Sequence, residues 1–117
     1  MNIEQFRDFC LALPGVTEEF PFGEETLVYK VMGKMFTLTS LDSFESINLK
    51  CDPETAVELR ERYDGVSPGY HMNKKHWNTV DVHAGISDKL IYQWIRDSYD
   101  LVVDSLPKKT KELLKNT

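Results

Sequence analysis

Cysteine is scarce in this chain of 117 residues, which contains only Cys10 and Cys51. The two lie far apart and form neither a Cys-x-x-Cys redox pair nor a zinc-type spacing. No uninterrupted apolar run approaches the length of about 18 residues that a membrane-spanning helix needs, and Met1 to Asp8 lack the apolar run of a secretory signal. These absences exclude a disulfide scaffold. They predict a cytoplasmic protein with reduced thiols and no membrane partner.

Basic residues are fewer than acidic ones: the chain contains 14 Lys and Arg and 19 Asp and Glu, so its net charge is -5. This balance counts against nonspecific binding to nucleic acid or to an anionic membrane, so such binding would require a local basic patch. The length suits one domain, and neither a repeat nor a linker divides the chain. We therefore predict a single domain over residues 1–117.

Apolar residues at helical spacing, introduced by capping residues, predict three main helices. Their starts are marked by Asn2, by Asp52 before a proline, and by Ser87. Their ends are expected at Pro14-Gly15, Gly65 and Leu106. Pro107 then resets the chain into a short basic tail helix.

Between Thr26 and Lys50 the hydrophobic period changes to two, which predicts three strands. The gaps at Gly33 and at Leu41-Asp42-Ser43 are short, so an antiparallel meander is the economical connection. A fourth strand is expected over Trp77 to Val82. Because helices and strands do not alternate strictly, we predict an α+β fold with two layers, a mainly antiparallel sheet and helices packed on one face.

Several aromatic and acidic residues resemble site residues but are better explained by folding. Glu18-Glu19 and Glu24-Glu25 flank Phe20-Pro21-Phe22-Gly23, and adjacency in sequence does not make two carboxylates converge on one pocket. We interpret them as a solvated rim around a structural turn, with Phe20 and Phe22 at the edge of the core. Trp94 and Tyr99 are likewise predicted to be core residues.

The signatures of common enzymes are absent. Gly33-Lys34 lacks the remaining residues of a phosphate-binding loop, and the chain has no Gly-x-Ser-x-Gly elbow. His71, His76 and His83 offer no two-ligand helical face for zinc. We expect no enzymatic activity, no metal and no cofactor.

The segment from Ser67 to Val80 is the part of the chain that folding alone explains least. Its lysines can neutralise phosphates, its Tyr, His and Trp rings can stack on bases, and its asparagines can make paired polar contacts. A structural loop can use all of these residues too, with solvated lysines and a tryptophan covering the end of the sheet. Both interpretations stay open on composition alone.

Motifs spread along nearly the whole chain resemble the MmcQ/YjbR family. The most specific is the run Asn73-Lys74-Lys75-His76-Trp77-Asn78, for which no generic secondary structure accounts. The others are Leu13-Pro14-Gly15, Phe20-Pro21-Phe22-Gly23, Tyr29-Lys30-Val31, Gly33-Lys34-Met35-Phe36, Leu49-Lys50-Cys51-Asp52-Pro53, Pro68-Gly69-Tyr70-His71-Met72 and Ser98-Tyr99.

This resemblance implies a small α+β domain of the secretion-chaperone-like type, often described as a double-wing DNA-binding fold. It carries no catalytic assignment, and a fold does not establish a function. The resemblance implies DNA contacts for residues in the matching motifs, namely Lys50, Lys74, Lys75, His76, Trp77 and Asn78.

Two further hypotheses compete with DNA binding. One is a protein-interaction or chaperone-like module, either a homodimer or a complex with another protein, without nucleic-acid binding. The other is a small-molecule binder or enzyme with a pocket at His76-Trp77. The charge pattern bears on the choice, because residues 1–25 hold six acidic and one basic side chain while Lys108, Lys109, Lys111 and Lys115 lie in the tail. DNA binding requires that the tail lysines and the Lys74-Lys75 pair lie on one side.

Overall fold

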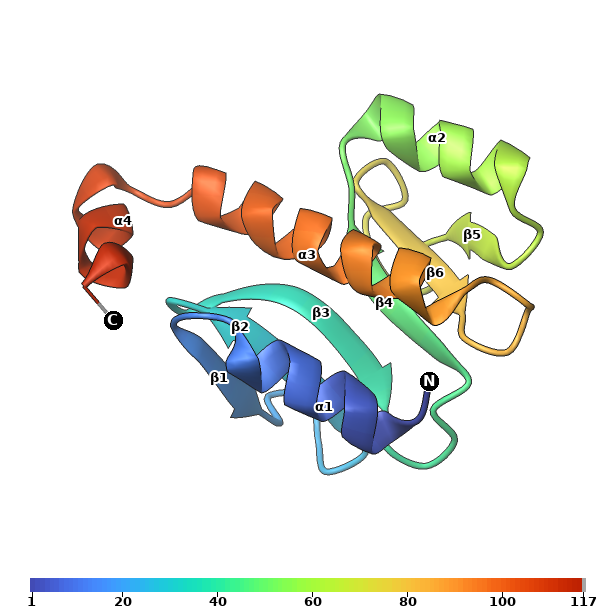
Figure 1. The fold of residues 1–117 in the computed structure, drawn as a ribbon, viewed down its shortest axis with the longest axis horizontal. Coiled ribbons are helices and arrows are strands. Elements are labelled where there is room, and N and C mark those ends of the chain that lie inside the picture. The colour runs from blue at the N-terminus through green and yellow to red at the C-terminus, as the bar shows by residue number, and fades with distance from the viewer. Residues whose placement is uncertain (117) are drawn as a thin grey trace.

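The computed structural model describes residues 1–116, and within them the chain forms four helices and six strands (Figure 1). In chain order these are α1 (Ile3–Ala12), β1 (Val16–Glu19), β2 (Thr26–Val31), β3 (Lys34–Ser40), β4 (Ser46–Lys50), α2 (Pro53–Arg62), β5 (Val66–Pro68), β6 (Trp77–Asp81), α3 (Asp88–Asp104) and α4 (Lys108–Lys115).

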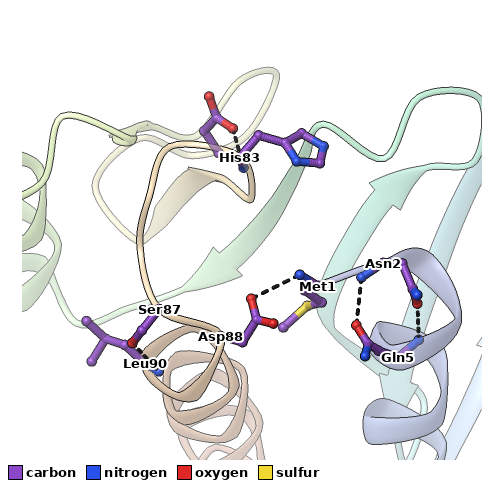
Figure 2. Close-up of polar contacts among 8 residues, drawn as sticks. Met1, Asn2, Gln5, His83, Ser87, Asp88 and Leu90 are labelled. Atoms are coloured by element: carbon purple, nitrogen blue, oxygen red, sulfur yellow. Dashed lines mark hydrogen bonds and ion pairs between the residues drawn. The ribbon is translucent and has the colours of Figure 1, made fainter.

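The predicted helix starts are confirmed by their capping bonds. Asn2 and Gln5 form a reciprocal capping box at α1, and the Ser87 side chain accepts a bond from the Leu90 backbone at α3 (Figure 2). At α2, Asp52 accepts bonds from two backbone N–H groups. A dashed line in Figure 2 marks the ion pair between the Met1 amino group and the Asp88 carboxylate, which joins the starts of α1 and α3. The two atoms are 3.0 Å apart.

All six strands described belong to one antiparallel sheet with the order β1-β2-β3-β4-β6-β5. Helix α3 packs on the central strands β2, β3 and β4, while α1 packs on β1 and α2 on β5 and β6. This arrangement confirms the α+β class and the antiparallel sheet.

The main core lies between the sheet and the helices. Strand alternation directs Leu27, Tyr29 and Val31 of β2 toward this side, where they join Ile91 and Ile95 of α3 in one buried cluster. Trp94 and Tyr99 are buried in the same cluster, as predicted. We call the sheet surface on the other side the open face.

Two strands and one turn differ from the sequence-based prediction. Strands β1 and β5 were not predicted, because both are short edge strands with little hydrophobic alternation and β5 ends in Pro68. The prediction that Phe20 and Phe22 border the core is wrong, since they are 46% and 66% exposed. Within residues 1–116, the structure contains no helix that is both long and apolar enough to cross a membrane.

Candidate functional site

The open face carries a small apolar cluster of its own. Val28 and Leu38 project from β2 and β3, and Trp77 at the start of β6 packs against them. Trp77 is only 8% exposed, so its ring covers the sheet. Met72, from the loop before β6, is half-buried against the same cluster. This loop, residues 69–76, therefore lies over one end of the open face.

Backbone bonds hold the 69–76 loop in a defined conformation. The Gly69 N–H donates to the Trp77 carbonyl at 2.8 Å, and the Tyr70 N–H donates to the Thr79 hydroxyl at 2.9 Å. At the other end of the loop, the Trp77 N–H donates to the Asn73 carbonyl at 2.9 Å. A Cβ atom at Gly69 would lie 2.8 Å from the Trp77 Cβ, so the close approach requires glycine there.

Arg60 of α2 clamps this loop from the helix side. Its Nε donates to Asn78 Oδ1 at 2.6 Å, and its Nη2 donates to the carbonyls of Lys74 and Trp77. Sequence reasoning missed this role. A basic residue in the last turn of a helix is ordinarily explained by the helix dipole, and nothing local in the sequence points from Arg60 to the loop.

Five of the six predicted site residues meet at this end of the sheet. Lys50 of β4 pairs in register with Trp77 of β6, and the next N–H, from Cys51, donates to the His76 carbonyl at 2.8 Å. Lys74 and Lys75 are exposed on the loop immediately before. The Lys74 ammonium donates to the Gly69 carbonyl at 3.1 Å, which leaves Lys75 as the freer of the two cations.

Asn78, the sixth residue, has a structural position. Its side chain is 2% exposed and faces the helices, where its Nδ2 donates to the Ala56 carbonyl at 3.3 Å while Oδ1 accepts from Arg60. It joins α2 to β6. The amide is therefore committed inside the fold and does not reach the open face.

A groove of about 510 Å³ runs over the open face beside the 69–76 loop. It is lined by Phe22, Thr26, Leu38, Thr39, Ser40, Ser46, Asn48, Tyr70, His71 and Met72. Two of these aromatic rings are largely exposed, Tyr70 at 70% and Phe22 at 66%, and they come from two different loops. The His71 ring lies 4.0 Å from the Tyr70 ring, measured between centroids. The groove therefore combines exposed aromatic rings with hydroxyl and amide groups.

The tail lysines do not join this basic end. Helix α4 packs against the turn between α1 and β1. Its Leu114 side chain lies so close to Gly15 in this turn that a Cβ atom there would collide with it. Figure 1 places α4 at one end of the long axis, beyond α3, and places β6 beside α2. Helix α4, which carries the tail lysines, therefore lies apart from β6 and from the loop that precedes it.

The thiol nearest the site is not prepared for nucleophilic chemistry. Burial, assisted by the charges of Asp52 and Asp97, raises the pKa of Cys51 to about 11, so the thiol is protonated at neutral pH. Within residues 1–116, no three or more His, Cys, Asp or Glu side chains are grouped so as to hold a metal ion. The groups that remain for ligand contact are lysine side chains, exposed aromatic rings, and hydroxyl and amide groups.

Known proteins resemble this chain over most of its length. It is 43% identical over 110 residues to the protein YbdF of Escherichia coli O157:H7, covering 93% of this chain and 90% of YbdF. It is 30% identical to YjbR of Escherichia coli K12, covering 97% and 98%.

Solved structures show the same fold. A crystal structure of a Deinococcus radiodurans protein, described as containing domain DUF419, matches with a TM-score of 0.92 at 36% identity, covering 97% of this chain and 88% of that one. A Pseudomonas syringae crystal structure matches with a TM-score of 0.74 at 28% identity, covering 86% and 98%. The family model described as YjbR matches residues 11–101. The chain therefore belongs to the YjbR family.

Proposed function

We propose that this protein binds DNA, as single strands, along the groove on the open face beside the 69–76 loop. The observation that carries the proposal is the groove itself, which is lined by the exposed rings of Tyr70 and Phe22 and lies beside the loop that carries Lys74 and Lys75. Lys50 pairs in register with Trp77, the residue that follows this loop. Lysines attract the phosphate backbone, and exposed aromatic rings stack on unpaired bases.

Single strands suit this surface better than a duplex. The cations near the groove are few, and Lys30 on the open face is paired with Glu19 at 3.2 Å. A duplex interface depends on many phosphate contacts, whereas each base stacked on an aromatic ring contributes about 1–3 kcal/mol without requiring positive charge. An acidic protein with exposed aromatic residues therefore gains more from unpaired bases.

The test is a fluorescence-anisotropy titration of a labelled oligonucleotide, as a single strand and as a duplex, at two salt concentrations. Contacts from three lysines predict that the logarithm of the binding constant falls by about 2 for each tenfold rise in salt, at about 0.7 per single-strand contact. The double variant Lys74→Ala/Lys75→Ala should lose most of this slope. Tyr70→Ala should weaken binding by about tenfold without changing the slope.

A matched control removes the same charge elsewhere. Lys108→Ala/Lys109→Ala deletes two exposed lysines of α4, which lies apart from β6 and α2 (Figure 1), and should leave the affinity within about twofold. Equal weakening by both double variants would show a nonspecific charge effect. Binding that Tyr70→Ala leaves unchanged would contradict the groove as the site.

A second candidate is a protein-interaction or chaperone-like module. The exposed Phe20 and Phe22 favour it, because apolar side chains that the fold leaves uncovered are typical of protein interfaces. Light scattering over a range of concentrations tests the homodimer version. A mass that rises to twice the monomer in the wild type, and stays at the monomer in Phe22→Ser, would support self-association through this turn.

A further inference from the structure

A second cavity lies on the opposite side of the sheet, under the helices. It has a volume of about 260 Å³ and lies between α2, α3 and strands β4 and β6. Its walls are apolar and are formed by Leu49, Leu59, Val80, Trp94 and Leu101. Because the groove proposed to bind DNA is on the other face, this cavity is a separate feature.

The polar border of the cavity is acidic. Asp52, the N-cap residue of α2, and Asp97 of α3 both border it, as does Cys51. Burial is the main cause that raises the pKa of the Cys51 thiol, the charges of both carboxylates raise it further, and the charge of Arg60 acts in the opposite direction. The side-chain bonds of Asp97 include one from Gln93 on the same helix at 2.9 Å, and the structure shows no ion pair for either aspartate within residues 1–116.

The nearby cations are directed elsewhere. Arg60 is committed to Asn78 and to two carbonyls of the 69–76 region. Lys50 borders the cavity, but Leu49 faces the helices, and strand alternation directs the Lys50 side chain to the open face. The N-terminus of α2 is occupied by the Asp52 carboxylate, which accepts bonds from two backbone N–H groups there. An anionic ligand would therefore meet negative charge.

We propose that this cavity binds a small amine consisting of one compact apolar group and one ammonium group. The apolar group fills the space between Leu59, Trp94 and Leu101, and the ammonium lies at the border near Asp52 and Asp97. A cavity of about 150 Å³ accommodates benzene, so 260 Å³ has room for a phenyl ring with a short side chain. An ammonium pairs with carboxylates that remain solvated, so neither ion is buried alone.

Phenethylamine is the probe, and 2-phenylethanol is its neutral counterpart of nearly the same shape. Each is titrated into the ¹⁵N-labelled protein while amide shifts are followed by NMR. We expect amine binding at about millimolar Kd, with the shifts concentrated at the start of α2 and in the middle of α3. The alcohol should bind about fivefold or more weakly, because one ion pair at the protein surface contributes about that factor.

Two single-charge variants on α3 separate the site from general electrostatics. Asp97→Asn should weaken phenethylamine binding about fivefold and leave the alcohol unchanged. Asp100→Asn removes the same charge from a residue that contacts Arg96 at 3.3 Å, and it should leave the Kd within about 1.5-fold. Equal effects of the two variants would overturn the proposal.

Cys51 supplies an independent measure of occupancy, because it lines the cavity and is half-buried. Saturating phenethylamine should slow alkylation of Cys51 severalfold at pH 9, whereas 2-phenylethanol at the same concentration should have a smaller effect. Amide shifts on the open face instead of α2 and α3, or an alkylation rate that the amine does not change, would refute binding in this cavity.

Discussion

Ser98 of α3 is completely buried between this helix and the sheet. Its hydroxyl bonds to both β3 and β4. The pairing of β3 with β4 ends at Thr37 and Leu49. Beyond that point the Lys50 N–H donates to Ser98 Oγ at 2.8 Å, and the hydroxyl donates to the Phe36 carbonyl at 2.6 Å. One side chain thus satisfies a backbone donor and a backbone acceptor that the separating strands leave unpaired.

Replacement of Ser98 by alanine should therefore lower the free energy of unfolding by about 1–3 kcal/mol, because two buried backbone groups lose their partner. Urea denaturation measures this loss. Ser105→Ala is the matched control, since the Ser105 hydroxyl caps the exposed end of the same helix by a bond to the Val102 carbonyl. A Ser98→Ala change no larger than that of the control would contradict the bridging role.

At the scale of elements, α2 and the 69–76 loop depend on each other. The loop has few apolar contacts of its own apart from Met72 and the adjacent Trp77. Its position is set by Gly69, by backbone bonds to β6, and by the Arg60 clamp from α2. The loop that carries Lys74 and Lys75 is consequently held in place before any ligand binds, which reduces the entropy cost of binding.

Arg60→Ala should release the loop and destabilise the fold by about 1–3 kcal/mol, because the buried Asn78 Oδ1 loses its donor. The rates of amide hydrogen exchange at Gly69 and Tyr70 should rise by more than the loss of global stability alone explains. Arg62→Ala, two positions further on α2, removes an exposed arginine over the Tyr63 ring and serves as the control. Unchanged exchange at Gly69 in Arg60→Ala would show that backbone bonds alone hold the loop.

For the whole molecule, the position of the lysines concerns ligand binding, and the buried thiols concern the dependence of stability on pH. Helix α4, which carries four lysines, lies at one end of the molecule, away from α2 and β6 (Figure 1). The thiols act on stability instead. Burial raises the pKa of Cys51 to about 11 and that of Cys10 still further from an ordinary value of 9.0.

Stability should fall as the pH rises through the range 9 to 11. There the unfolded chain releases its thiol protons while the folded chain retains them, so the unfolded state binds fewer protons and the free energy of unfolding decreases with pH. The fully buried Cys10 should contribute up to about 1.4 kcal/mol per pH unit. Urea denaturation at pH 8 and pH 10.5, with Cys51→Ala for comparison, measures this loss. A free energy that is constant between these pH values would contradict it.

Local signals predicted much of the architecture. The caps Asn2, Asp52 and Ser87 and the three strands of the meander follow from side chains within a few positions of each other, and the structure confirms them. The edge strands β1 and β5 were missed because their pairing depends on a neighbouring strand more than on their own composition.

The candidate site was predicted less completely. The segment from Ser67 to Val80 was singled out from its composition, and the resemblance to the family named Lys74 to Asn78 within it; the structure pairs Trp77 with Lys50. The burial of Asn78, the Arg60 clamp and the exposure of Phe22 had no local signal. Each of these depends on which distant segment of the chain packs against the residue, and this is decided only when the helices pack on the sheet.

The sequence by itself determined the α+β class, the helix boundaries within a few residues, the acidic balance and the family. Only the tertiary structure decided that α4 lies apart from β6, that Ser98 joins positions 36 and 50, and that a groove and a cavity lie on opposite sides of the sheet. The physical reason is the range of the interactions. Caps and hydrophobic periods operate within a few residues, whereas the Ser98 bonds span 48 and 62 positions and exist only after the layers have packed.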